Sequence, residues 1–144
     1  MSLSSELQNI YLFGMSGGLN HEMRTLLKAS NASLATSPND AGIVIKVLKE
    51  DMKRRVISIG QTGKSQEMEL DYYLRFQFYD NQENPLLQQQ TIELSRAFFN
   101  DQLALLAKEN EENTIRIEMY RQAARMLMSR AEVAVNSKKN KNAL

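Results

Sequence analysis

The feature that most constrains the fold is a strict alternation of apolar and polar side chains over residues 68–78. The apolar positions are Met68, Leu70, Tyr72, Leu74, Phe76 and Phe78. The positions between them carry Glu69, Asp71, Tyr73, Arg75 and Gln77. Because successive side chains of a strand point to opposite faces of a sheet, this pattern predicts a β-strand with one buried face and one face in water.

Other strands are predicted on both sides of this one. Residues 10–15 form a short apolar run, and Ile92 and Leu94 continue the alternation after a reversal at residues 80–85. Residues 43–59 have β-branched side chains at both ends and a charged middle, which fits either a tight hairpin or one long strand bent by a bulge. Consecutive strands joined by short reversals pair antiparallel.

Gly60 and Gly63 predict a reversal after residue 59, because glycine accepts the positive φ of a short hairpin. A first helix is predicted from Asn20, as its N-cap, to Leu34, because apolar residues recur there at spacings of three and four. Residues 36–42 form a turn that ends it.

A closing helix is predicted to begin at Asn100 or Asp101, since neither Gly nor Pro follows. Asn110 and Asn113 interrupt its apolar stripe, so a break there stays open. Residues 136–144 are rich in Lys and Asn and predict a disordered basic tail. The predicted fold is an α+β two-layer sandwich in the order β-α-β-β-β-α, with a largely antiparallel sheet of about four strands and two helices on one face.

Composition limits the chain to one domain, predicted to span residues 1–135. The length of 144 residues is enough for one core, and the absence of cysteine excludes disulfides and thiolate metal sites. No apolar run approaches the roughly 20 residues that span a bilayer. The net charge is +1, but the charges are unevenly distributed along the chain. Residues 42–64 hold six basic and two acidic side chains.

No constellation of side chains indicates catalysis. His21 is the one histidine, and no nucleophile accompanies it at a motif spacing. Glu109, Glu111 and Glu112 fit an exposed charged helix face better than a metal site, which usually recruits His or a loop with Asp-Gly spacing. We therefore predict a protein that is not an enzyme and has no metal site and no cofactor.

The basic residues of segment 49–55, with Lys64 beyond it, are candidates for binding an anionic ligand. Multidentate Lys and Arg contacts hold phosphate groups, so lipid phosphates, nucleic acid or an anionic membrane all fit. An equally good interpretation is a solvated sheet edge whose charges discourage aggregation.

The stretch from residue 94 to residue 127 resembles the C-terminal half of a known family. The residues that carry the likeness are Arg96, Phe98, Phe99, Leu105, Ala107, Lys108, Glu109, Asn110, Glu111, Glu118, Met119, Tyr120, Ala123 and Ala124. They resemble the lipopolysaccharide-assembly lipoprotein family LptE. Most of the chain follows the family pattern, and the family favours one long strand over residues 43–59.

This resemblance implies a non-catalytic outer-membrane subunit that plugs the β-barrel protein LptD and contacts lipopolysaccharide. It implies ligand contacts by Lys108 and by basic residues near the hairpin, for which Lys64, Lys53 and Arg55 are the candidates. A polar sheet face suits a polar barrel lumen, so Tyr73 and Arg75 are the candidate partner contacts. The alternative is a binding module for another anionic ligand, nucleic acid or anionic lipid, through residues 49–55.

The beginning of the chain departs from the family pattern. Members start with a signal peptide and a lipid-bearing cysteine, whereas this chain starts Met1-Ser2-Leu3. We expect an ectodomain trimmed at its N-terminus, with a lipid anchor in the native precursor. The implied location is the outer membrane, on the periplasmic side and in the barrel lumen.

Overall fold

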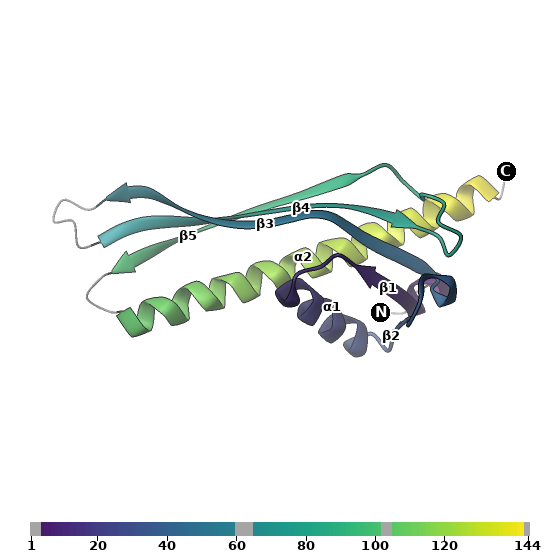
Figure 1. The fold of residues 1–144 in the computed structure, drawn as a ribbon, viewed down its shortest axis with the longest axis horizontal. Coiled ribbons are helices and arrows are strands. Elements are labelled where there is room, and N and C mark those ends of the chain that lie inside the picture. The colour runs from purple at the N-terminus through teal and green to yellow at the C-terminus, as the bar shows by residue number, and fades with distance from the viewer. Residues whose placement is uncertain (1–3, 60–64, 102–104, 143–144) are drawn as a thin grey trace.

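The computed structural model describes residues 4–59, 65–101 and 105–142. Two short 3-10 helices, η1 and η2, accompany two α-helices and five strands. The elements are η1 Ser5–Gln8, β1 Asn9–Phe13, α1 Gly17–Ala29, β2 Ser33–Leu34, η2 Pro38–Asp40, β3 Ile43–Ile59, β4 Ser65–Tyr79, β5 Gln90–Asp101 and α2 Leu105–Asn142. The predicted α+β class is confirmed, with both helices on one face of the sheet (Figure 1).

The sheet has five strands in the order β2-β1-β3-β4-β5. β3 pairs antiparallel with β4, and β4 pairs antiparallel with β5, as expected for consecutive strands. β1 pairs parallel with both β2 and β3, so the sheet is mixed. The additional strand, β2, has two residues, too few to leave an alternation in the sequence.

The predicted alternation on β4 is confirmed. Its six apolar side chains at positions 68–78 are buried, and they point toward the helices. We call this side of the sheet the inner face and the opposite side the outer face. The polar side chains at positions 69–77 lie on the outer face and are partly exposed.

Residues 43–59 form one long strand rather than a hairpin, which decides between the two predicted alternatives. The register against β4 shifts at two places, between Val47 and Lys49 and between Val56 and Ser58. Each shift is a bulge that absorbs one extra residue. β1 covers the edge of β3 at Ile43 to Lys46 alone, so the charged middle of β3 lies at a free edge. The predicted reversal at Gly60 and Gly63 falls outside the described residues.

The first helix begins four residues earlier than predicted, because its N-cap is Ser16 instead of Asn20. The Ser16 hydroxyl oxygen accepts a hydrogen bond from the backbone N–H of Leu19 at 3.3 Å. Gly18 lies in the first turn, where an added Cβ would overlap the ring of Tyr120 on α2. Gly18 therefore allows a close approach of the two helices. The helix also ends before Leu34, which belongs to β2.

The closing helix begins later and ends later than predicted. Asn100 and Asp101 belong to β5, where they pair with Gln66 and Ser65, so neither begins α2. The helix is unbroken from Leu105 to Asn142.

The predicted disordered tail is helical as far as residue 142. Ala134 and Val135 are buried, and the Lys138 ammonium lies 3.6 Å from the Asp80 carboxylate. These contacts hold the last turns of α2 against the sheet end. On this helix Ile117 is exposed, while Met119 is buried.

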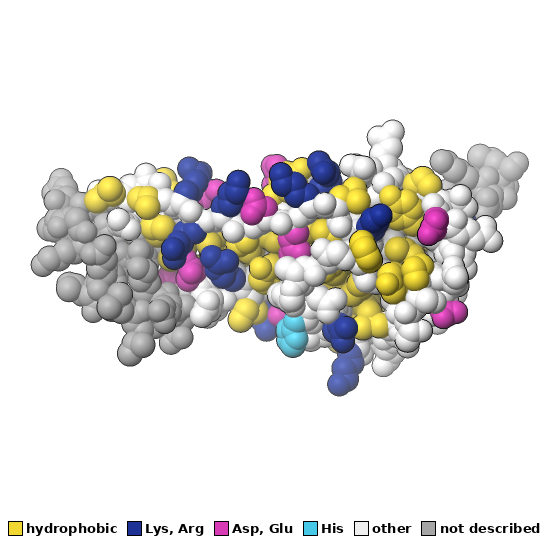
Figure 2. Space-filling model, in the orientation of Figure 1, with side chains coloured by type: hydrophobic (Ala, Val, Ile, Leu, Met, Phe, Trp, Pro, Cys, Tyr) yellow, Lys and Arg dark blue, Asp and Glu magenta, His cyan; other side chains and the backbone are white. Residues whose placement is uncertain are grey.

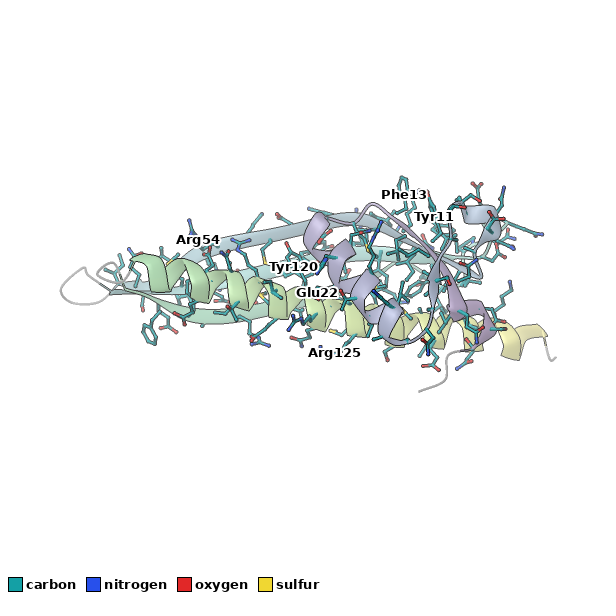
Figure 3. All side chains as sticks on the ribbon, turned by 90° about the horizontal axis from the view of Figure 1, so that it is seen from below. Tyr11, Phe13, Glu22, Arg54, Tyr120 and Arg125 are labelled. Carbon is teal, nitrogen blue, oxygen red and sulfur yellow. The ribbon has the colours of Figure 1, made fainter. Side chains whose placement is uncertain are left out.

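The α2 helix contacts α1 through a polar pair and β4 through an aromatic pair. Glu22 of α1 is buried, and its carboxylate accepts from Nε of Arg121 at 3.2 Å. The rings of Tyr72 and Tyr120 pack edge to face with centroids 5.4 Å apart. Figure 3 shows Glu22 and Tyr120 close together where the helices meet.

None of the described helices combines the length and the apolar character that crossing a bilayer requires.

A carboxylate at the inner face ties the start of α1 to the sheet. Glu50 of β3 accepts from the Tyr72 hydroxyl at 2.6 Å, and from the backbone N–H and the hydroxyl of Ser16 at 2.7 Å each. Burial, reinforced by the Glu50 carboxylate, raises the pKa of Tyr72 far above its ordinary value. The Tyr72 hydroxyl therefore stays protonated and remains a donor.

Candidate interaction face

The outer face of β3, β4 and β5 is a polar surface that the described helices leave uncovered. Both helices lie on the other side of the sheet (Figure 1). Strand alternation and register bring the outer side chains together. They include Lys49, Asp51, Lys53 and Arg55 of β3, Glu67, Glu69, Asp71, Tyr73, Arg75 and Gln77 of β4, and Thr91, Glu93 and Ser95 of β5. Figure 2 shows Lys and Arg side chains in a row along β3 with acidic side chains among them.

One part of this face is an internally satisfied charge network. Arg55 donates from one terminal nitrogen to Glu69 at 2.7 Å and from Nε to Asp71 at 2.9 Å. The Ser95 hydroxyl also donates to Asp71, at 2.8 Å. The Ser95 hydrogen bond lowers the pKa of Asp71 below its ordinary range. Partial desolvation opposes this shift, and Glu69 and Arg55 add to it. Lys53 lies 3.3 Å from Asp51.

The basic segment 49–55 is divided between the two faces of the sheet. Lys53 and Arg55 lie on the outer face, whereas Arg54 points to the inner side and donates to Glu112 of α2 at 3.1 Å. Figure 3 shows Arg54 beside the first part of α2. Since each of these three cations has an acidic partner, the segment does not present one continuous basic surface.

A second part of the outer face lacks such compensation. Lys49 and Arg75 stand directly opposite each other in the β3–β4 register. The described salt bridges include neither of them. The Lys49 ammonium lies 5.5 Å from the centre of the Tyr73 ring, a cation–π distance. Nε of Arg75 is shielded from solvent and has no hydrogen-bond partner among the described residues.

Two hollows mark this side of the molecule. One, of about 350 Å³, is lined by Lys49, Asp51, Lys53, Asp71, Tyr72, Tyr73, Glu93, Leu94 and Ser95. The other, of about 400 Å³, is lined by Tyr11, Phe13, Pro38, Val44, Lys46, Tyr79, Asp80 and Glu83. Figure 2 shows hydrophobic side chains gathered at the β1 end of the molecule. The second hollow was missed by sequence reasoning, because it joins residues from separate elements.

Two of the predicted ligand residues cannot be described at the side-chain level. Lys64 lies outside the described residues, and Lys108 lies in α2 with a side chain that is also outside them. At one end of the molecule β3 stops, and β4 and α2 begin (Figure 1). Val56, Ile59 and Phe99 are exposed hydrophobic side chains of the same end.

The described residues contain no cluster of three or more side chains suited to hold a metal ion. His21 is exposed on α1. The described hydrogen bond at His21 involves its backbone oxygen, which accepts from the Thr25 hydroxyl at 3.0 Å. No described nucleophile or carboxylate is hydrogen-bonded to the imidazole ring. The chemistry that this surface supports is recognition by charge, hydrogen bonding and ring contact.

Comparison with known proteins identifies the family. A model of the LptE family, described as lipopolysaccharide-assembly, matches residues 5–131. This chain belongs to the LptE family. Membership supports a role in lipopolysaccharide assembly and places the chain among envelope lipoproteins. LptE is not a known enzyme family. The resemblance noted in the sequence is thereby confirmed.

Individual relatives agree with the family match. The LPS-assembly lipoprotein LptE of Pectobacterium atrosepticum is 30% identical over 131 residues, which cover 89% of this chain and 69% of that protein. The crystal structure of the rare lipoprotein B from Shewanella oneidensis is 28% identical with a TM-score of 0.71, and the match covers 90% of this chain and 98% of that one. A lipoprotein B of Nitrosomonas europaea has the same fold, with a TM-score of 0.76 at 17% identity and coverage of 94% and 92%.

Proposed function

We propose that this protein is a non-catalytic assembly subunit of the outer membrane that docks in the LptD barrel and contacts lipopolysaccharide during its insertion into the outer leaflet. One observation carries the proposal: the helices cover one face of the sheet and leave the other open. Membership in the lipopolysaccharide-assembly family supports the interpretation of this open face as a docking surface.

The outer face suits a polar barrel lumen. The lumen of an outer-membrane barrel is lined by polar side chains, and the outer face offers charges of both signs around Tyr73. Tyr73 and Arg75 are the proposed partner contacts, because Tyr and Arg dominate many protein interfaces. The proposed location is the periplasmic side and the barrel lumen, with a lipid anchor at the native N-terminus.

The proposed lipopolysaccharide contacts are Lys108, Lys64, Lys53 and Arg55. Lipid A presents phosphates on an acyl platform, so a basic site beside exposed apolar side chains fits it. Val56, Ile59 and Phe99 supply such side chains near the end where β4 and α2 begin. Arg55 already donates to two carboxylates and Lys53 lies beside a third, so a phosphate must compete for them. We therefore expect Lys64 and Lys108 to contribute more.

Retention by LptD of the same cell tests the docking proposal. Replacing Tyr73 and Arg75 together by Ala should leave the melting temperature of the domain near that of the wild type and weaken copurification. Full copurification of a folded double variant would move the interface to another surface.

Capture by immobilised lipopolysaccharide tests the ligand proposal separately. Lys64→Glu and Lys108→Glu should each reduce capture, whereas Lys28→Glu, at an exposed position of α1, should not. Wild-type capture should fall with salt and keep an apolar, salt-resistant part. Equal capture by all three variants would remove the ligand role while leaving barrel docking intact.

The alternative function, binding of nucleic acid or another anionic ligand through residues 49–55, gains no support from the geometry. Lys53, Arg54 and Arg55 are each within 3.3 Å of a carboxylate. Tighter retention of duplex DNA than of lipopolysaccharide at physiological salt would favour this alternative, because counterion release gives nucleic-acid binding a steep salt dependence.

A further inference from the structure

The outer face carries a pair of like charges to which the described residues give no acidic partner. Lys49 and Arg75 occupy directly opposite positions on β3 and β4, and Thr91 is opposite Arg75 on the other side. Like charges at directly opposite positions destabilise a sheet. Neither cation forms a described salt bridge. Arg55, further along the outer face of β3, instead has two acidic partners. Within the described part of the chain, neither cation of the pair therefore has an acidic partner.

The Arg75 guanidinium is also poorly solvated at one nitrogen. Its Nε is shielded from water, and no described residue offers it an acceptor. Arginine keeps its charge at all relevant pH values, so this donor cannot be silenced by losing a proton. A shielded donor without an acceptor is unfavourable. An incoming carboxylate would give the guanidinium group the charge-assisted hydrogen bonds that no described residue supplies.

The surroundings of this pair favour a protein segment over a phosphate-bearing ligand. The adjacent hollow is lined by Asp51, Asp71 and Glu93 as well as by Lys49 and Lys53. A polyanionic ligand placed there would meet three carboxylates. A protein segment can instead place an acidic side chain at Arg75 and a basic or neutral one at Glu93, which has no salt bridge among the described residues.

We propose that Arg75 is the anchor of the docking face and receives an Asp or Glu carboxylate from the protein partner. Lys49 supplies a second positive charge beside that carboxylate, and the Tyr73 ring packs against the partner chain. This inference rests on the proposed docking of the outer face and specifies its chemistry. It also implies that the uncomplexed domain is less stable than it would be without the like-charge pair.

Two measurements on the same variants test the inference, the melting temperature of the isolated domain and its dissociation constant for purified LptD in detergent. Arg75→Gln removes one charge of the pair, so the melting temperature should stay equal or rise. Retention by LptD should weaken by at least about tenfold, as expected when one partner of an interfacial charge pair is lost. Arg75→Glu should weaken it further, and Lys49→Gln should weaken it less.

Arg96→Gln is the matched control, because it removes the same charge from the neighbouring strand on the inner side of the sheet. It loses a 3.6 Å contact with Glu118 and should bind LptD within about twofold of the wild type. A structural role for Arg75 would instead appear as a clear drop in melting temperature of both Arg75→Gln and Lys49→Gln. That result would overturn the inference.

The remaining outcomes separate the inference from the proposed function. Wild-type retention of Arg75→Glu by LptD would overturn the anchor while docking stands. Failure of the wild-type domain to bind LptD would overturn both. Loss of capture by immobilised lipopolysaccharide, with binding to LptD unchanged, would show that Arg75 serves a phosphate ligand and that the protein-carboxylate inference is wrong.

Discussion

Leu70 and Leu74 are fully buried on the inner face of β4, whereas Asp71 and Tyr73, one residue away, are partly exposed on the outer face. The inner side chains meet α1 and α2, while the described contacts of the outer ones are with neighbouring strands. The two faces therefore have different tasks. Apolar burial on the inner face holds the fold, whereas the described helices leave the outer face uncovered, and we propose it as the docking face.

The largest difference between the faces should appear on truncating neighbouring side chains of β4. Leu74→Ala removes a fully buried side chain, and we expect a loss of about 2–5 kcal/mol in the free energy of unfolding. Tyr73→Ala, on the outer face, should lose less than about 1 kcal/mol. Chemical denaturation of both variants measures this contrast. Similar losses would show that the two faces do not differ in their contribution to stability.

A smaller effect should come from the packing of the helix layer. Gly18→Ala places a methyl group against the Tyr120 ring, which the edge-to-face contact with Tyr72 holds in place, so we expect a loss of about 1–3 kcal/mol. At Gly17 an added methyl group meets nothing within 4 Å, so Gly17→Ala should be neutral or slightly stabilising. Unfolding curves of the two variants that coincide would mean that α1 and α2 are not closely packed.

The polar contact inside the inner layer should contribute less again. Tyr72→Phe removes the 2.6 Å hydrogen bond to Glu50 and leaves that carboxylate with the two Ser16 donors, so about 1–2 kcal/mol should be lost. Tyr73→Phe is the control on the outer face, because its hydroxyl makes no described hydrogen bond, and it should melt as the wild type does. Equal melting of both variants would contradict the role of Glu50 as an anchor of α1.

The smallest effect concerns the turn after β4 and depends on pH. Burial alone would raise the pKa of Asp80, but hydrogen bonds from the backbone of Asn84 and Gln82 outweigh it and lower the pKa below 3.8. The folded carboxylate thus stays charged where the unfolded one gains a proton. Its contribution to stability is present above the unfolded pKa and is lost as the pH falls through the folded value.

Melting temperatures between pH 7 and pH 2 test this prediction. Asp80→Asn should melt lower than the wild type at pH 7, and the gap should narrow as the solution becomes acidic. Glu83→Gln, an exposed neighbour in the same turn, should keep the wild-type profile. A gap between Asp80→Asn and the wild type that stays constant down to pH 2 would show that the Asp80 charge does not stabilise the fold.

The sequence predicted the fold where the pattern was regular and failed where tertiary contacts decide. The alternation at residues 68–78 was sufficient for β4, because a period of two has one structural meaning. Ser16 was missed as the helix cap because Gly17 and Gly18 are typical of turns, and the need of Gly18 for space depends on Tyr120, about a hundred positions away. Asn100 and Asp101 look like helix caps in sequence, but pairing with β4 holds them in β5.

The same reasoning applies to the interaction face. Alternation correctly placed Tyr73 and Arg75 on the polar side of β4. It could not separate Arg55 from Arg75, because the difference lies in the cross-strand neighbours, which are carboxylates for Arg55 and Lys49 for Arg75. Register is set by the bulges in β3, which no local motif reveals.

The most direct test of the central claim is the rate of hydroxyl-radical oxidation of Tyr73 in the free domain and in the domain bound to LptD. Tyr72, one residue away and buried against the helices, is an internal reference that should remain slow in both states. If the outer face is the docking face, binding should slow the oxidation of Tyr73 severalfold and leave Tyr72 unchanged. Equal oxidation of Tyr73 in the free and bound states would contradict the account.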